Sequence, residues 1–216
     1  MPENLFETQY DLTKKTKLRE FYESKKILIY SSILSLIIII ASYAYYLESS
    51  EKKKIYLSEN YMQAKVYLER GNKTKAVEIL RDVIFSNDPT YSTLSFFMIL
   101  NENLISSKQE VSKLFDHLLE NNKFDKEIRD LLLYKKTLYK SNYVEEPKML
   151  EEIKPLLNNK ESVWKGHALL LLGDFYFSKK EYIKAKDFYS EILSTENLQQ
   201  DLYNQAKSKL VFIADD

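Results

Sequence analysis

An uncharged stretch of 21 residues, Ile27–Leu47, constrains this chain more than any other feature of its sequence. It reads ILIYSSILSLIIIIASYAYYL, and a helix of this length, at about 1.5 Å of rise per residue, matches the roughly 30 Å hydrocarbon core of a bilayer. Tyr30 near one end, and Tyr43, Tyr45 and Tyr46 near the other, lie at the depths where amphipathic rings settle. The stretch therefore predicts one transmembrane helix over 27–47, through which the chain contacts the lipid bilayer.

Basic residues on the two sides of this stretch indicate its orientation. The preceding segment, 1–26, carries Lys14, Lys15, Lys17, Arg19, Lys25 and Lys26, whereas the near side of the following part, 48–216, carries Lys52, Lys53 and Lys54. Because positive charge is retained on the cytoplasmic side, we expect a cytoplasmic N-terminal segment and an exported C-terminal domain.

A cleaved signal peptide is the alternative to an uncleaved signal anchor. Ser42-Tyr43-Ala44 places small residues where a signal peptidase reads them, so cleavage after Ala44 stays open. The segment before the apolar stretch is long and contains acidic residues, and the stretch exceeds the usual 7–15 residues of a signal-peptide core. These features favour the uncleaved anchor.

Composition excludes several kinds of chemistry. The chain has no cysteine, which removes disulfides, thiol catalysis and cysteine-ligated metals. It has only three glycines, too few for a glycine-rich phosphate loop, and its net charge of zero shows none of the basic excess of a nucleic-acid binder. We therefore expect no nucleic-acid partner and no cofactor.

The remainder of the chain predicts an all-α domain. Apolar residues recur at helical intervals, as in Ala76, Leu80, Val83 and Ile84, and no stretch alternates as a half-buried strand does. Turn residues such as Gly71-Asn72 separate the segments. The expected helices cover 50–70, 73–86, 90–105, 108–121, 125–141, 147–158, 161–178, 181–194 and 199–213.

Two of these helix pairs resemble tetratricopeptide repeats, which are helix–turn–helix units of about 34 residues. In the later pair, Leu172-Gly173 is followed by Tyr176, and Ala185 comes twelve residues after Gly173 with Tyr189 four further on. In the earlier pair, Ala64 stands in the glycine position and is followed by Tyr67, Ala76 and Leu80 at the same spacing. We expect the small residues to lie where helices cross and the larger ones to pack beside them.

Residues 90–158 carry helices in the right number but no such motif, and Ala64 and Gly173 are 109 residues apart, which is not a whole number of units. An irregular unit must lie between them. The tetratricopeptide-like solenoid is therefore predicted from its two ends, with 199–213 as a terminal cap. An ordinary set of helical hairpins is the alternative.

The order of the parts is similar to the membrane-anchored tetratricopeptide family of the ancillary subunit of the bacterial SecYEG translocon. A short basic segment, one apolar helix and a helical domain follow one another, and Trp164-Lys165-Gly166-His167-Ala168 precedes the best repeat. The resemblance implies a single-pass protein of the bacterial inner membrane with a periplasmic domain. Its implied partners are the Sec translocon and a periplasmic chaperone.

No catalytic constellation accompanies these features. His117 and His167 are the only histidines, and neither has a second histidine nearby to complete a metal site. We expect a non-enzymatic protein that binds partners on the concave face of its repeats. A tetratricopeptide adaptor for cell division or envelope assembly is the alternative. Carried over by the resemblance, the groove positions are Ser58, Tyr61, Lys65, Leu68 and Glu69 in the first unit, and His167, Leu170, Asp174, Phe177 and Ser178 in the last.

Overall fold

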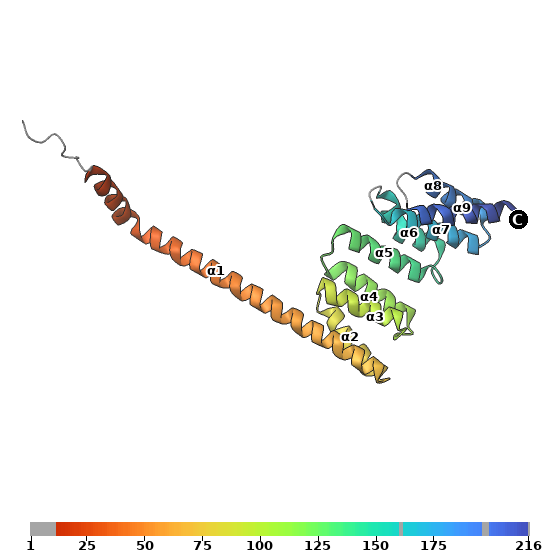
Figure 1. Cartoon of the computed structure of the whole chain (residues 1–216), viewed down its shortest axis with the longest axis horizontal. Helices are drawn as coiled ribbons and strands as arrows, with labels where there is room; N and C mark the ends of the chain where they lie inside the picture. The colour runs from red at the N-terminus through yellow and green to blue at the C-terminus, as the bar shows by residue number, and fades with distance from the viewer. Residues whose placement is uncertain (1–11, 160–161, 196–198, 216) are drawn as a thin grey trace, which may run out of the picture. The chain divides into compact units, whose positions relative to one another are not determined.

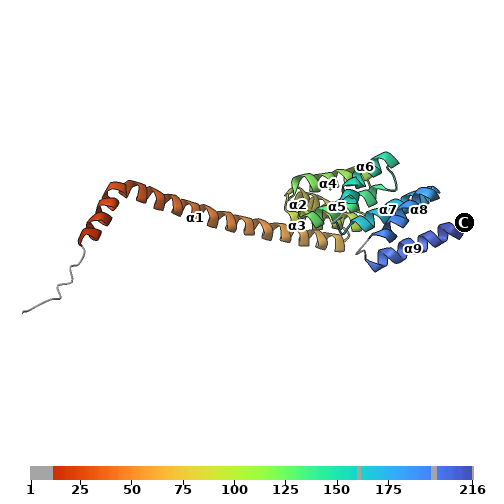
Figure 2. The same ribbon diagram turned by 90° about the horizontal axis from the view of Figure 1, so that it is seen from above.

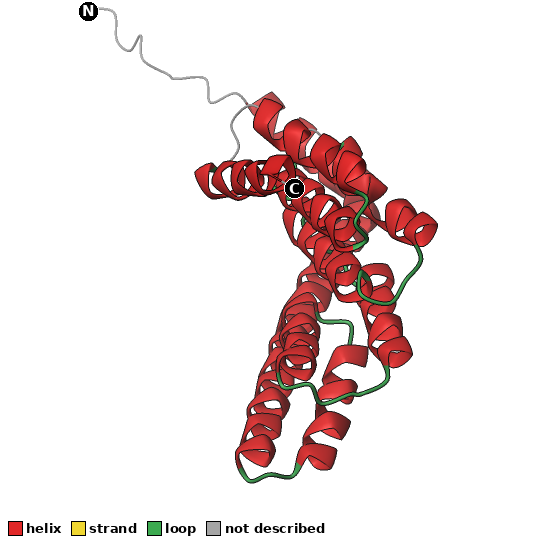
Figure 3. Ribbon diagram, turned by 90° about the vertical axis from the view of Figure 1, so that its right-hand side faces the viewer, coloured by secondary structure: helices red, strands yellow, loops and turns green. Residues whose placement is uncertain are grey.

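The computed structural model is all-helical over the residues that it describes, which confirms the all-α part of the predicted fold class (Figures 1 and 3). It describes the backbone of residues 12–159, 162–195 and 199–215, and the side chains of 19–159, 162–195 and 199–214. Residues 1–11 of the predicted N-terminal segment, and the side chains of Lys14, Lys15 and Lys17, lie outside them. The described helices are α1 (Leu12–Glu69), α2 (Lys73–Phe85), α3 (Pro89–Asn101), α4 (Lys108–Asn121), α5 (Lys126–Lys140), α6 (Glu146–Asn158), α7 (Lys165–Ser178), α8 (Tyr182–Ser194) and α9 (Gln200–Asp215).

Helix α1 is continuous, where the sequence predicts a transmembrane helix to Leu47 and a new helix from residue 50. Residues 48–54 contain no glycine or proline, so nothing interrupts the hydrogen bonds of the helix. The helix ends at Glu69, and the turn that follows contains Gly71, whose φ of +78° suits glycine. There the Asn72 N–H donates to the Tyr67 carbonyl at 2.8 Å and the Gly71 N–H to the Leu68 carbonyl at 2.9 Å, a Schellman motif.

The chain divides into two compact units, and the boundary between them along the chain falls between Tyr56 and Leu57. In the first unit, α1 is the one described helix that is long and apolar enough to cross a membrane. Its apolar side chains are exposed, from Ile27 through Ile37 and Ile38 to Leu47. An apolar surface of this kind is unfavourable in water and favourable in lipid.

The second unit contains the end of α1 and helices α2 to α9. Helices α2 and α3 begin at side-chain caps where the sequence places turn residues: the Asn72 side chain accepts from the Lys75 N–H, and the Asp88 side chain accepts from the Tyr91 N–H. Pro89 follows Asp88 as the first residue of α3, a position where its missing N–H costs nothing.

Helices of this unit pack on helices one or two positions away in the chain, as Figure 2 also shows for α7, α8 and α9. Two apolar clusters result. The N-terminal cluster joins α1 to α4 through the buried residues Ala64, Ala76, Leu80, Ile84, Phe96, Ile99, Val111, Leu114, Phe115 and Leu118. The C-terminal cluster joins α6 to α9 through Met149, Ile153, Leu156, Ala168, Leu169, Leu171, Leu172, Phe175, Tyr176, Ala185, Tyr189, Ile192 and Ala206.

Helix α5 lies between the clusters, with Tyr139 packed on the first and Tyr134 on the second. Its buried contacts are partly ionic. Lys140, only 5% exposed, donates to the Glu152 carboxylate of α6 at 2.6 Å. Lys136 lies 2.6 Å from the Asp116 carboxylate of α4. Charged pairs therefore connect α5 to α4 and to α6, in the region between the two apolar clusters.

Candidate functional site

The last helix pair is built around a close approach of Gly173 on α7 and Tyr189 on α8. A Cβ added to Gly173 would lie 2.3 Å from Cε1 of the Tyr189 ring, far inside van der Waals contact. Tyr189 is fully buried, and its hydroxyl donates to the Asp174 carboxylate at 2.7 Å. Burial and this hydrogen bond raise the pKa of Tyr189. Gly173 is thus the residue that allows α7 and α8 to pack at this distance.

Tyr176, also on α7, joins the same pair to α6. Its ring stacks on Phe188 with centroids 5.5 Å apart, and its hydroxyl donates to the Glu146 carboxylate at 2.8 Å. Lys184 donates to the same carboxylate at 3.0 Å. The hydrogen bond from Tyr176, followed by that from Lys184, lowers the pKa of Glu146. Burial, followed by the hydrogen bond to Glu146, raises the pKa of Tyr176 to about 12.

The repeat positions of the first pair lie in the N-terminal cluster. Ala64, Ala76 and Leu80 are fully buried there, and Ala185 is buried in the same way in the last pair. Tyr67 is half-buried at the edge of the N-terminal cluster. Small residues therefore lie inside both helix pairs that the sequence singles out.

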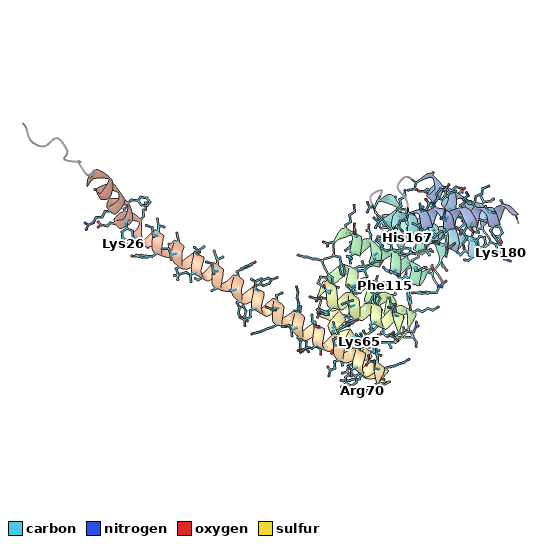
Figure 4. The ribbon with its side chains drawn as sticks, viewed as in Figure 1. Lys26, Lys65, Arg70, Phe115, His167 and Lys180 are labelled. Carbon is cyan, nitrogen blue, oxygen red and sulfur yellow. The ribbon has the colours of Figure 1, made fainter. Side chains whose placement is uncertain are left out.

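Three of the five groove positions of the first helix pair line an open hollow of about 280 Å³ between α1 and α3 (Figure 4 labels Lys65). Lys65, Leu68 and Glu69 form its α1 side, and Met98 and Glu102 form its α3 side. Tyr61 lies one turn earlier on α1, with its ring 6.5 Å from that of Tyr91 on α3. Ser58 is half-buried a turn before it.

The groove positions of the last helix pair, α7 and α8, have partners within the chain. His167, which Figure 4 labels on α7, lies against Trp164 and against Tyr134 of α5, and burial lowers the pKa of its imidazole. Asp174 also pairs with Lys209 of α9 at 3.1 Å, and Phe177 packs on Phe212 of α9 with centroids 5.7 Å apart.

Of the remaining two positions on α7, Ser178 is exposed and Leu170 is not. Leu170 is half-buried against the C-terminal cluster, and Ser178 donates to the Phe175 carbonyl. Helix α9 therefore covers part of the surface that the sequence predicts as a groove in the last helix pair, at Asp174 and Phe177.

A second hollow, which sequence reasoning did not find, lies between α3 and α5. It has a volume of about 360 Å³, and its apolar lining comes from Leu94 of α3, from Phe124 in the segment between α4 and α5, and from Ile128 of α5. Its N-terminal edge is Pro89, and Lys123 and Asp125 lie at its rim. The signal in the sequence is that 94–100 is apolar on nearly every face, more than a helix with one buried side requires.

Within the described residues, no group of three or more His, Asp or Glu side chains could hold a metal ion. His117 instead joins two helices: Nε2 lies 2.9 Å from Oδ1 of Asn87, and Nδ1 lies 3.2 Å from Nδ2 of Asn121. Both ring nitrogens are thus engaged, and His117 connects the end of α2 to α4.

Comparison of the chain with protein-family models, with curated proteins and with solved structures finds no match in any of the three.

Proposed function

We propose that this chain is a non-enzymatic, membrane-anchored scaffold that binds other proteins through its helical domain. The observation that carries the proposal is that an exposed apolar span, 27–47, continues as one helix into an array whose α1, α3 and α5 line two open hollows. Lipid would stabilise the first part, and a partner would cover the hollows of the second.

Within this proposal, the array is a tetratricopeptide-like solenoid on the periplasmic face of the inner membrane, and its partners are the Sec translocon and a periplasmic chaperone. The spacing of Gly173, Tyr176, Ala185 and Tyr189, and the order of basic segment, apolar helix and helical domain, support this reading. The proposal predicts that translocon or chaperone components co-purify with the chain from gently solubilised membranes. Recovery of neither, from membranes where both are abundant, would contradict it.

Orientation can be measured directly because the chain has no cysteine. We expect a single cysteine at Ile183, 82% exposed on α8, to react with a membrane-impermeant maleimide added to the periplasmic side. A cysteine at Ser24, before the apolar span, should react only after the inner membrane is opened. Labelling in the reverse order would overturn the orientation, and loss of an N-terminal tag in the mature chain would reveal cleavage after Ala44.

Cellular distribution separates this proposal from the alternative of a cell-division or envelope-assembly adaptor. A fluorescent fusion should be distributed over the whole inner membrane if the chain works with the translocon. Enrichment at the septum would instead favour the adaptor.

A further inference from the structure

Helix α1 bends just before its apolar span. Figures 1 and 2 both show this change of direction near the N-terminal end of the helix, and Figure 4 labels Lys26 beside it. Residues 12–26 contain neither proline nor glycine. The Ser24 hydroxyl instead donates to the Phe21 carbonyl at 3.1 Å, and a serine bonded back to the preceding turn in this way often bends a helix. The segment before Ile27 therefore leaves the axis of the span.

Two tyrosines contact each other across this bend. Tyr22 and Tyr30 are eight residues apart in the chain, which is about 12 Å along a straight helix. Their rings lie edge to face with centroids 6.4 Å apart, and their hydroxyls also contact each other. This contact connects the segment before the span to the first turns of the span.

The segment carries an excess of positive charge. Residues 14–26 contain six basic residues and two acidic ones, Glu20 and Glu23. Arg19 lies 3.0 Å from the Glu23 carboxylate, but both side chains are exposed, so water screens the pair. Lys25 and Lys26 form no ion pair with a described side chain.

The other end of the span lacks such an excess. Residues 48–54 contain three lysines, at 52–54, and two glutamates, Glu48 and Glu51. Lys52 lies 2.7 Å from the Glu48 carboxylate. The two ends of the span therefore differ in the charge that they present, and the later end supplies a matched control.

Aromatic side chains of the segment are uncovered as well. Phe21 and Tyr22 are exposed, and Leu28, two helical turns after Phe21, is exposed in the same way. Aromatic rings settle between acyl chains and water, and basic residues beside a transmembrane helix attract anionic phospholipid by about fivefold each. A bent segment with uncovered rings and unpaired lysines thus matches the headgroup layer, which begins where the apolar span ends.

We propose that the segment 14–26 lies along the lipid headgroups and binds anionic phospholipid in preference to neutral phospholipid. Arg19, Lys25 and Lys26 contact the anionic headgroups, and Phe21 and Tyr22 lie at the boundary with the acyl chains. The inference rests on the membrane-anchored part of the proposed function and adds the class of lipid that surrounds one end of the anchor.

The test uses the full chain with Trp164→Phe and Phe21→Trp, so that its one tryptophan lies in the segment. The chain is placed in phosphatidylcholine nanodiscs that contain the same fraction of either brominated phosphatidylglycerol or brominated phosphatidylcholine, with bromine near the headgroup end of the acyl chains. Bromine quenches only a tryptophan that it contacts. We expect the brominated phosphatidylglycerol to quench at least about twofold more strongly. Equal quenching by the two lipids would overturn the inference.

Variants assign the preference to the segment. Arg19→Gln with Lys25→Gln and Lys26→Gln should remove most of the difference between the two lipids, because each basic residue attracts anionic lipid. Lys52→Gln with Lys53→Gln and Lys54→Gln removes as many basic residues from the other end and should leave the difference unchanged. The inference is wrong if both triple variants behave alike.

Salt gives an independent readout. The Debye length falls from about 30 Å at 0.01 M salt to about 3 Å at 1 M, so an electrostatic preference should weaken over this range. A preference for phosphatidylglycerol that is unchanged at high salt would contradict its assignment to the basic residues.

A second reporter separates this inference from the anchor on which it rests. Tyr46→Trp, with Trp164→Phe, places the tryptophan near the other end of the span. If neither brominated lipid quenches this reporter, the span is not in the bilayer and the anchor itself fails. If both lipids quench it while the reporter at position 21 shows no preference, the anchor stands and the proposed lipid contact of the segment is wrong.

Discussion

Replacement of Gly173 by alanine should destabilise the helical domain, although alanine is the better helix former. A Cβ at this position would lie 2.3 Å from Cε1 and 2.6 Å from Cδ1 of Tyr189. Tyr189 has no free space to yield, because it is fully buried and its hydroxyl is held by Asp174. Relief of the overlap requires the ring or helix α8 to move by about 1 Å.

The magnitude follows from two opposing effects. The gain in helix propensity is about 1 kcal/mol. Overpacking of a well-filled core costs about 1–3 kcal/mol, and weakening of the buried hydrogen bond to Asp174 costs about another 1 kcal/mol. The net loss of unfolding free energy is therefore about 1–3 kcal/mol, or a fall in Tm of roughly 3–10 °C for a domain of this size.

Urea unfolding of the full chain in detergent micelles measures the effect through the fluorescence of Trp164, the only tryptophan, which contacts Tyr134 and His167. Tyr189→Leu removes most of the obstructing ring, so its cost should be smaller in the Gly173→Ala background than alone. Additive effects of the two substitutions, or a Gly173→Ala chain as stable as the parent, would refute the role given to this contact.

Three further predictions concern charge and the membrane. The pKa of Tyr176 is raised to about 12 in the folded chain. The stability that its protonated hydroxyl contributes is therefore complete below the unfolded-state pKa of about 10 and is lost as pH rises towards 12. Tyr176→Phe should remove this part of the loss of stability in alkaline unfolding. Lys140→Met leaves the Glu152 carboxylate without its closest cation and should cost about 3 kcal/mol in urea unfolding. Lys140→Met with Glu152→Leu should recover most of that loss, and equal stability of the parent and both variants would contradict the role given to this buried ion pair. Leu34→Arg with Ile38→Arg should release the chain from membranes in alkaline carbonate, because each arginine costs about 3 kcal/mol in the bilayer, whereas alanines at the same positions should leave it in the pellet.

The sequence predicted best those features that depend on near neighbours in the chain. The boundaries at Asn72 and at Asp88-Pro89 follow from capping and proline chemistry, and the ends of α2 and α3 lie within a few residues of the expected positions. The sequence does not predict that α1 is continuous, because the change from apolar to charged residues after Leu47 suggests a helix boundary there. Composition changes the solvent that a helix prefers, whereas glycine or proline changes its backbone, and residues 48–54 contain neither.

Features that depend on distant pairing could not be predicted. Lys136 meets Asp116 twenty residues earlier, and neither residue belongs to a periodic pattern that would indicate the contact. The hollow around Leu94 and Ile128 lies in the stretch without repeat motifs, so the repeat comparison had no position to assign there. The cover that α9 places over Phe177 likewise depends on how the last helix docks, which its composition does not determine.

The neighbour-to-neighbour packing of α2 to α9 has a consequence for how the domain is made. A chain delivered from its N-terminal end, by a ribosome or through a channel, completes the N-terminal cluster once Leu118 has emerged, before Met149 of the C-terminal cluster is available. Contacts of such short sequence separation form fast and in the order of delivery. Burial of apolar side chains can therefore keep pace with emergence, and the growing chain exposes about one unfinished helix pair at a time to chaperones or to aggregation.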